Sequence, residues 1–314
     1  MLNIICLVDS PMDLALVIPN ISPGNDSRLR THILSAFYSS NGIIFEGEWV
    51  SDKEATGDLL YRDGSQYTGQ VSAGKPHGRG RETNKFNDVY DGSFIHGVRE
   101  GEGVESLASG DVYEGNFVSN KRNGYGILRL DSGERYEGMW LDNKYHGQGR
   151  FLCSDNSEFV GNYCEGERVG HGRMRMADGS TYDGQWRNNQ EHGQGTLLLA
   201  SGATYVGEWR NGSKKKGCYT LPNGNVYTGE FDQNKANGQG TLKCLDGSSY
   251  AGFWKNHQFH GHGVHHFANK DCYIGEHCSG KEHGEGEMRF ASNKIYKGIF
   301  NSGMMHGRGV ITCT

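Results

Sequence analysis

The sequence predicts an all-β protein, an elongated single-sheet solenoid of about twelve antiparallel β-hairpin repeats. An aromatic residue recurs every 23 residues, or 22 at two places, and a glycine always follows it two positions later. Each period also holds two short stretches in which apolar or glycine residues alternate with polar residues. Such alternation is typical of half-buried strands. A fixed period of this length indicates a repeat fold in which neighbouring units share a continuous core.

Residues 1–41 lie outside the period, and residues 42–314 form the repeat array. The first segment is apolar, but Asp9, Pro11 and Asp13 interrupt it and no cationic stretch precedes it. A signal peptide is therefore not expected. Two interpretations remain open: an extended capping segment that covers the first repeat, and a docking strand for a partner.

The first strand of each repeat is built around its aromatic anchor, which we count as position 0. Glycine stands at position 2 of every copy, and a second large residue stands at position 4 except at Val71 and His277. Side chains alternate faces along a strand, so these three positions share one face of the sheet. The anchors are Phe45, Tyr67, Tyr90, Tyr113, Tyr136, Phe159, Tyr182, Tyr205, Tyr227, Tyr250, Tyr273 and Tyr296.

The second strand follows a polar loop and opens with Gly-x-Gly. In the fifth copy Gly147, Gly149, Phe151 and Cys153 form its apolar set. A glycine or asparagine three residues before most anchors favours a tight turn between repeats. We expect Gly240 to face Trp254, so that a large residue always lies opposite a glycine. The glycines predicted to be structural for this reason are Gly138, Gly184, Gly207 and Gly252.

Composition limits the classes of function. The chain has 314 residues with 49 glycines, a net charge of −5 and a mean hydropathy of −0.68. A mildly acidic chain argues against a nucleic-acid partner. No apolar run is long enough for a spanning helix. The eight cysteines include no Cys-x-x-Cys pair and are expected to be reduced thiols of an intracellular protein.

These motifs resemble the MORN repeat (membrane occupation and recognition nexus), whose pattern is Tyr-x-Gly-x-Trp/Phe, a short polar loop and Gly-x-Gly. Twelve copies cover residues 42–314. The resemblance implies a non-enzymatic scaffold or adaptor without cofactors, as in ciliary radial-spoke heads, cytoskeletal complexes and junctional membrane tethers. It implies a cytoplasmic, cytoskeleton-associated location, with the axoneme of a cilium or flagellum among the alternatives. Glu82, Asn84 and Glu105 depart from the pattern because they fall on the face that is otherwise apolar.

A partner helix or extended peptide is expected along the aromatic face, where the array is most regular. The predicted contact residues are Trp140, Tyr163, Trp186, Trp209 and Trp254. The alternative function is a peripheral membrane tether that binds phosphoinositides. Lys214, Lys215 and Lys216 form the basic run that would contact the lipid, although one short cluster on an acidic protein is a weak anchor.

Histidines are the candidates for a metal site. Six of the 14 stand at position 10, which we expect to be a loop, and a denser group lies near the C-terminus. Imidazole and thiolate are ligands that suit zinc, so His265, His277 and Cys272 are the candidate ligands. No standard ligand spacing is present, and the competing interpretation is a set of solvated turn residues. No nucleophile stands in an activated context, and the recurrent Gly-x-Gly is structural rather than a phosphate-binding loop.

The last strand predicts self-association. Solenoids need polar capping units, and residues 306–314 form an edge that is apolar at Val310 and Ile311. Uncovered edges recruit another strand, so we expect a homodimer joined through the C-terminal repeats. The alternative is that the native chain continues with its own cap.

Light scattering tests the homodimer. At micromolar concentration the chain should have the mass of a dimer, and Val310→Pro should give monomers because proline removes a donor from the ladder. A monomer mass that deletion of residues 296–314 leaves unchanged would contradict this expectation.

Overall fold

The computed structural model describes residues 15–17, 34–38, 42–51 and 53–313. Every helix or strand within these residues is a β-strand, which confirms the all-β class. The chain divides into two compact units, Met1–Ser154 and Asp155–Thr314.

The strands of the first unit are β1 (Ala15–Val17), β2 (Leu34–Tyr38), β3 (Ile44–Trp49), β4 (Glu54–Leu60), β5 (Gln66–Ser72), β6 (Lys75–Thr83), β7 (Val89–Ile95), β8 (Val98–Ser106), β9 (Val112–Val118), β10 (Lys121–Arg129), β11 (Arg135–Leu141) and β12 (Lys144–Leu152). Those of the second unit are β13 (Glu158–Cys164), β14 (Glu167–Arg175), β15 (Thr181–Arg187), β16 (Gln190–Leu198), β17 (Thr204–Arg210), β18 (Ser213–Thr220), β19 (Val226–Asp232), β20 (Lys235–Lys243), β21 (Ser249–Lys255), β22 (Gln258–His266), β23 (Cys272–Cys278), β24 (Lys281–Arg289), β25 (Lys294–Asn301) and β26 (Met304–Cys313).

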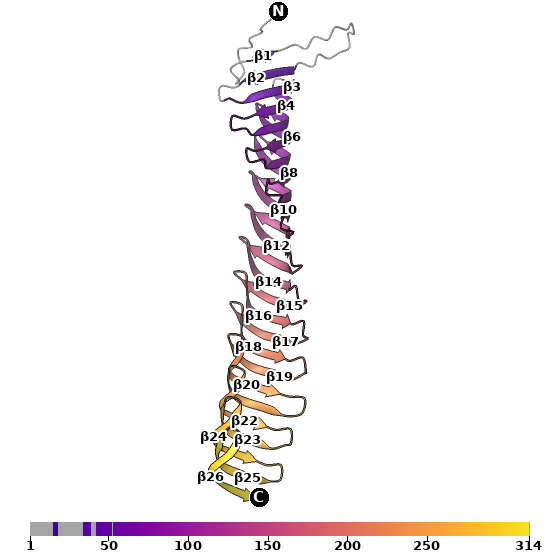
Figure 1. Cartoon of the computed structure of the whole chain (residues 1–314). Coiled ribbons are helices and arrows are strands. Elements are labelled where there is room, and N and C mark those ends of the chain that lie inside the picture. The colour runs from indigo at the N-terminus through magenta and orange to yellow at the C-terminus, as the bar shows by residue number, and fades with distance from the viewer. Residues whose placement is uncertain (1–14, 18–33, 39–41, 52, 314) are drawn as a thin grey trace, which may run out of the picture. The chain divides into compact units, whose positions relative to one another are not determined.

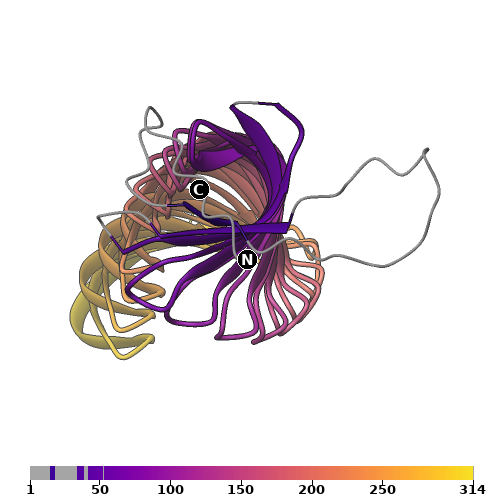
Figure 2. The same ribbon diagram turned by 90° about the horizontal axis from the view of Figure 1, so that it is seen from above.

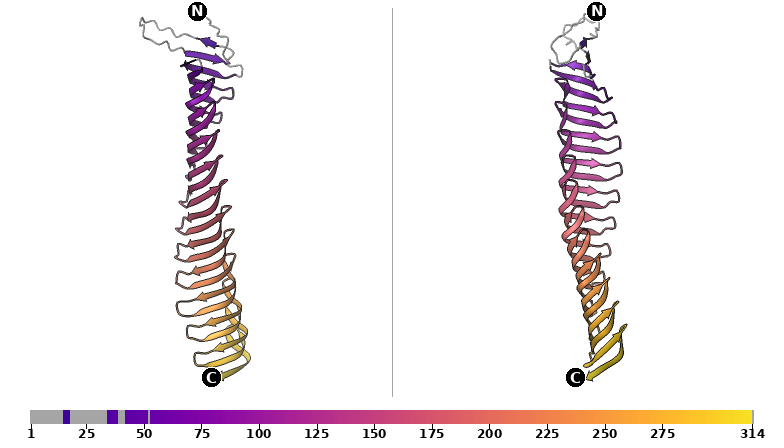
Figure 3. Two further views of the ribbon diagram at one scale, coloured as in Figure 1. Left: turned by 180° about the vertical axis from the view of Figure 1, so that it is seen from behind. Right: turned by 90° about the vertical axis from the view of Figure 1, so that its left-hand side faces the viewer.

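Within each unit, every strand pairs antiparallel with its neighbours in sequence (Figures 1 and 3). Seen from above, successive strands of a unit fan out instead of superimposing, as the twist of a sheet requires (Figure 2). Strand β2 pairs with β3, the first strand of the array. The other residues of 1–41, apart from β1, lie outside the described residues, so the role of this segment as cap or docking strand stays a prediction.

The turn inside each hairpin is shorter than the predicted polar loop. Asp142 and Asn143 have φ angles of 48° and 69°, as a two-residue type I′ turn requires. Strand β12 then starts at Lys144, before Gly-x-Gly. The histidines at position 10 therefore lie in strands, as His146 does, and the prediction of a loop there is wrong. The hairpin closes early because Asn, Asp and Gly accept positive φ at these two positions.

The two glycines of Gly-x-Gly have different roles. Gly147 has a φ of 59° and lies where the pairing shifts, since Gly138 is opposite Gly149 but Trp140 is opposite Tyr145. This is a β-bulge with glycine in the left-handed region. Gly149 instead lies under the ring of its own anchor.

The predicted register between repeats is wrong by two residues. Gly240 lies opposite Gly252, and Trp254 lies opposite Gly238. The backbone N–H of Cys244 donates to the carbonyl of Ser248, and the N–H of Gly247 donates to the carbonyl of Cys244. Cys244 is therefore level with Ser248, whereas the predicted register pairs it with Tyr250. The second glycine of Gly-x-Gly is therefore paired with the glycine at position 2 of the next repeat, and the first glycine is the one that faces the large residue.

These glycine pairs make room for the anchor ring of the same hairpin. A Cβ atom on Gly138 would lie 2.5 Å from the Cα atom of Gly149, and one on Gly149 would lie 2.6 Å from the Tyr136 ring. Gly184 and Gly252 are equally tight, with Cβ positions 2.5 and 2.6 Å from the Cα atoms of their partner glycines, and Gly207 packs in the same way. The ring of each anchor can lie flat on the sheet only because both residues lack a side chain.

The core of each unit is a ladder of these rings. The hydroxyl of Tyr182 donates a hydrogen bond to the carbonyl of Gln185 at 2.9 Å. Its ring makes edge-to-face contacts with Trp186 of its own repeat at 5.3 Å and with Trp209 of the next repeat at 5.2 Å. The Trp186 indole N–H donates to the Gly172 carbonyl of the preceding hairpin at 3.0 Å. Each ring thus joins two hairpins through geometry that aromatic pairs favour.

Gly138→Val should destabilise the first unit by about 1–3 kcal/mol or more, because the branched side chain would overlap the facing backbone and the Tyr136 ring. The measurement is the denaturant midpoint of the full chain. Met139→Val is the matched control, since Met139 is the next residue and is exposed on the opposite face; its effect should stay within about 0.5 kcal/mol. Equal effects of the two substitutions would contradict the clearance argument.

Candidate partner-binding face

We call the side of the sheet that carries the anchor rings the ring face. The five predicted contact residues, Trp140, Tyr163, Trp186, Trp209 and Trp254, lie on this face but are only 3–7% exposed. Their rings are used to pack hairpin against hairpin, which leaves little area for a partner. That these five side chains contact a partner directly stays a prediction, and their burial restricts such contact to the edges of the rings.

A second layer of side chains covers the rings. Tyr145, at position 9, stacks on Tyr136 with centroids 3.8 Å apart, and Phe259 stacks on Tyr250 at the same distance. Phe267 and Met288, at positions 17 and 15, pack against the buried rings near the C-terminal end of the second unit. We call the side chains at positions 9, 15 and 17 the cover layer, which in the shorter eighth repeat includes Tyr219 and Leu221.

Most of the cover layer is half-buried and therefore still available for contact. The sequence revealed the apolar character of positions 15 and 17. It did not reveal position 9, because the early closure of the hairpin puts the residue that was expected in a loop over the anchor ring.

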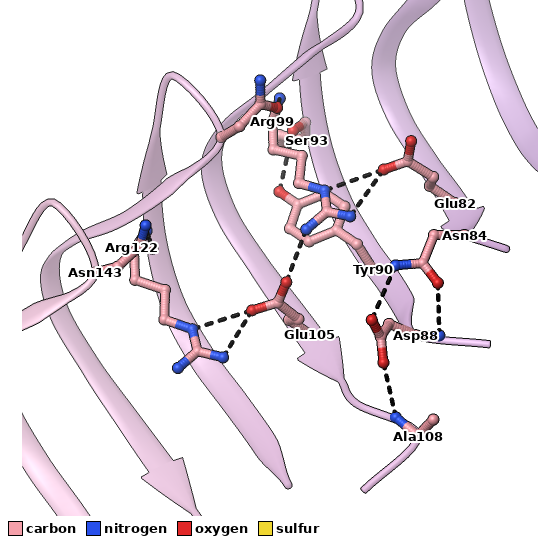
Figure 4. Close-up of polar contacts among 11 residues, drawn as sticks. Glu82, Asn84, Asp88, Tyr90, Ser93, Arg99, Glu105, Ala108, Arg122 and Asn143 are labelled. Atoms are coloured by element: carbon pink, nitrogen blue, oxygen red, sulfur yellow. Dashed lines mark hydrogen bonds and ion pairs between the residues drawn. The ribbon is translucent and has the colours of Figure 1, made fainter. Parts of the chain in front are cut away.

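Ion pairs replace apolar contacts in the cover layer of the first unit (Figure 4). Arg99 contacts Glu82 at 3.0 Å and Glu105 at 2.8 Å, and Arg122 contacts Glu105 at 2.8 Å. The Arg99 guanidinium also lies 4.7 Å from the ring centroid of Tyr90. The two glutamates that departed from the apolar pattern are therefore each held by arginine, and the four charges alternate along the face.

Asn84, the third departure from the apolar pattern, belongs to the network beside these pairs. Its amide donates to Asp88 at 2.9 Å, and the backbone amide of Ala108 donates to the same carboxylate at 2.8 Å (Figure 4). The hydrogen bond from Ala108 holds the pKa of Asp88 below its usual range. Burial raises the pKa of Tyr90 to about 12, so this phenol keeps its proton at neutral pH.

The three lysines of the predicted lipid site do not form one basic surface. Lys214 lies over the rings of Tyr205 and Tyr219, at 5.3 and 4.8 Å, and burial lowers its pKa. Lys215 is 3.8 Å from the carboxylate of Asp232. Lys214, opposite Trp209, lies on the ring face, whereas Lys215 and Lys216 together line a hollow that also contains Glu230 and Asp232. Among the described residues no helix is long and apolar enough to cross a membrane.

The opposite face of the first unit holds a shallow cavity that sequence reasoning missed. It is lined by charged side chains such as Arg81, Asp91 and Glu114 together with Val104 and Tyr125. Tyr125 donates a hydrogen bond to Glu137 at 2.6 Å. On the first strand of a hairpin these residues stand at odd positions, as Asp91 and Glu114 do. On the second strand they stand at even positions, as Arg81, Val104 and Tyr125 do, because the β-bulge shifts the alternation by one residue. Their alternation with the buried set within each strand was the available signal.

The predicted metal ligands are only partly brought together. His265 and His277 lie close to each other, and Glu282 is the third member of the cluster. Cys272 pairs with His266 across the strands and precedes the anchor Tyr273, so it points to the other face. Burial lowers the pKa of His277, and the hydrogen bond with His265 lowers the pKa of Glu282.

Paired β-hairpins with one buried ring face and a variable cover layer define a β-repeat protein that displays an extended surface. The family model for the MORN repeat matches residues 45–66, 67–84, 90–112, 113–135, 136–158, 159–181, 182–204, 205–226, 227–249, 250–272, 279–294 and 296–314. The chain therefore belongs to the MORN-repeat family.

Other comparisons add little to this identification. No curated protein matches the chain. Solved structures that resemble it include the TCP10 domain of Danio rerio CPAP in complex with a STIL peptide, at 8% identity and a TM-score of 0.31, covering 89% of this chain and 98% of that one. The SAS-4 TCP domain of Drosophila melanogaster in complex with a proline-rich motif of Ana2 matches at 16% identity and a TM-score of 0.32, covering 61% and 99%. At these TM-scores neither likeness supports an argument about this chain.

We call the row Glu82, Arg99, Glu105 and Arg122 the ion-pair ladder. Glu105→Gln should lower the stability of the first unit by about 1–3 kcal/mol. The substitution removes the negative charge that lies between the half-buried guanidinium groups of Arg99 and Arg122. Glu114→Gln is the matched control. Its partner Arg129 is 3.5 Å away and both side chains are about half exposed, so this change should cost about 0–1 kcal/mol. Denaturant midpoints of the two variants that differ by less than experimental error would contradict the importance of the ladder.

Proposed function

We propose that the protein is a non-enzymatic scaffold that binds a helix or an extended peptide of a protein partner across the cover layer. The observation that carries the proposal is the recurrence of half-buried apolar side chains at one repeat position on successive hairpins of the second unit. The row includes Met176, Leu199, Leu221, Phe267 and Phe290.

The spacing of this row suits an extended peptide. Strands lie about 4.8 Å apart, so one repeat position recurs about every 9.6 Å along a unit. Three residues of extended chain cover about 10 Å. In a peptide of polyproline II conformation, three residues make one turn of about 9.3 Å, so every third side chain faces the same way and can meet an equivalent site. Weak contacts then add up along the unit.

The first unit favours a different part of a partner. Its cover layer carries the alternating Glu82, Arg99, Glu105 and Arg122, all half-buried. Guanidinium and carboxylate groups held in fixed positions select partners by complementary charge more than they increase affinity. A partner segment that crosses several hairpins of the first unit would be selected there by complementary charge.

The cellular setting proposed for this scaffold is a cytoskeletal or ciliary assembly, and its support is the resemblance to the scaffold members of the MORN-repeat family. The alternative role as a membrane tether has less support, since Lys214 lies on tyrosine rings and Lys215 is paired with Asp232. No catalytic step is part of the proposal.

Affinity capture from cells, followed by quantitative mass spectrometry, tests which face binds. Leu199→Glu with Leu221→Glu introduces charge into the cover layer. Val206→Glu with Phe253→Glu introduces the same charge on the opposite face, where both side chains are about half exposed. We expect the first pair to lose the captured partners and the second pair to retain them.

Circular dichroism and thermal midpoints must show that both double variants are folded. Partners that are lost only with Val206→Glu and Phe253→Glu would place the binding surface on the opposite face and refute the proposal. Partners retained by both variants would refute it as well.

A further inference from the structure

His277 replaces a large aromatic residue in the core of the second unit. It stands at position 4, where Phe231, Trp254 and Phe300 stand in neighbouring repeats. The imidazole is 2% exposed. It lies between Tyr250 and Tyr273, with ring centroids 4.9 and 5.0 Å apart and the planes nearly perpendicular. Its packing therefore reproduces that of an aromatic ring.

The polar atoms of His277 are not satisfied by this packing. Neither ring nitrogen has a hydrogen-bond partner of normal geometry among the described residues. The tryptophans at the same position donate to a glycine carbonyl, as Trp254 does to Gly240 at 3.0 Å. A buried polar group without a partner costs free energy, so a second ligand for this imidazole would relieve a penalty that packing alone leaves.

Two further ligand groups lie above His277 in the cover layer. Glu282 is directly opposite His277 in the ladder, and His265 is opposite Tyr273. The Nδ1 atom of His265 is 3.3 Å from a carboxylate oxygen of Glu282. One ligand atom from each of the three residues lies within 4.8 Å of the others. An ion pair would explain His265 and Glu282 alone but not the position of His277.

The chemistry of this set is that of a zinc site. Two imidazoles and one carboxylate bind Zn²⁺ with an open fourth position, whereas Ca²⁺ and Mg²⁺ prefer oxygen ligands alone. Zinc bonds of about 2.0–2.2 Å put tetrahedral ligand atoms about 3.4 Å apart. The ligand atoms therefore need to approach one another by up to about 1.4 Å from their present limit of 4.8 Å. Half-buried cover-layer residues such as His265 and Glu282 can do this by small rotations.

We propose that His265, His277 and Glu282 bind one Zn²⁺ ion on the ring face of the second unit. His277 supplies a nitrogen from the core, and the other two residues supply a nitrogen and an oxygen from the cover layer. The fourth position faces outward, where water or a side chain of a bound partner completes the coordination.

Calorimetric titration of the metal-free full chain with ZnCl₂ tests the site, with the bound metal counted by mass spectrometry. We expect one high-affinity ion per chain and a thermal midpoint that rises with Zn²⁺. His277→Phe and Glu282→Gln should each weaken binding at least about 100-fold, since even groups that only support metal ligands change affinity about 10–100-fold. His277→Phe is expected to fold, because Phe231 and Phe300 occupy the same position in other repeats.

Two controls separate the site from adventitious binding by histidine or cysteine. His171→Gln removes an exposed imidazole that lies 3.0 Å from the carboxylate of Asp183. Cys272→Ser removes the thiol on the other face. Both should bind Zn²⁺ as the unmodified chain does. The proposal is overturned if no ion binds, if His277→Phe and Glu282→Gln bind normally, or if Cys272→Ser abolishes binding.

Discussion

The structure depends on a tyrosine ring that lies flat on a pair of glycines. In each regular hairpin the anchor covers the glycine two residues after it and the second glycine of Gly-x-Gly, as Tyr136 covers Gly138 and Gly149. The edge of the ring that the glycines leave uncovered then contacts the large residue of the next hairpin. Burial of such a side chain contributes about 1.5–3 kcal/mol and an edge-to-face pair about 0.5–1.5 kcal/mol. Because a single hairpin is marginal, these contacts between neighbours make a unit fold as an array.

Because the anchor rings are buried in the core, the side chains that differ most between repeats lie in the cover layer. The same few repeat positions carry ion pairs at Arg99 and Glu105, aromatic stacking at Tyr145 and Phe259, and a cation over tyrosine at Lys214. The backbone is fixed by glycine and tyrosine, so these side chains can vary without changing the fold. A scaffold of this kind can acquire contact specificity repeat by repeat, which is how repeat arrays provide extended binding surfaces.

The sequence predicted the fold class and the periodic faces because these depend on the identity of residues at fixed spacings. It did not predict the register, since the register depends on where each turn closes, and early closure at Asp142 and Asn143 turned an expected loop into a strand. The same error kept Glu282 out of the predicted metal site, because it stands at position 9, which the sequence places in a loop. Thiolate suits zinc, which makes Cys272 a candidate ligand from the sequence, but the alternation of faces places it away from His277.

The ion-pair ladder and the histidine cluster illustrate two ways in which this core departs from its apolar pattern. Glu105 is polar where leucine would fit, yet two arginines pair with its carboxylate. Its buried charge is therefore compensated by other residues of the chain. His277 is packed as well as the tryptophans are, and yet among the described residues it alone has both ring nitrogens buried without a hydrogen bond of normal geometry. A satisfied polar group can be explained by structure alone. A departure from the local pattern that the chain does not compensate indicates a role beyond folding, because natural sequences tend to keep such conflicts only at functional sites.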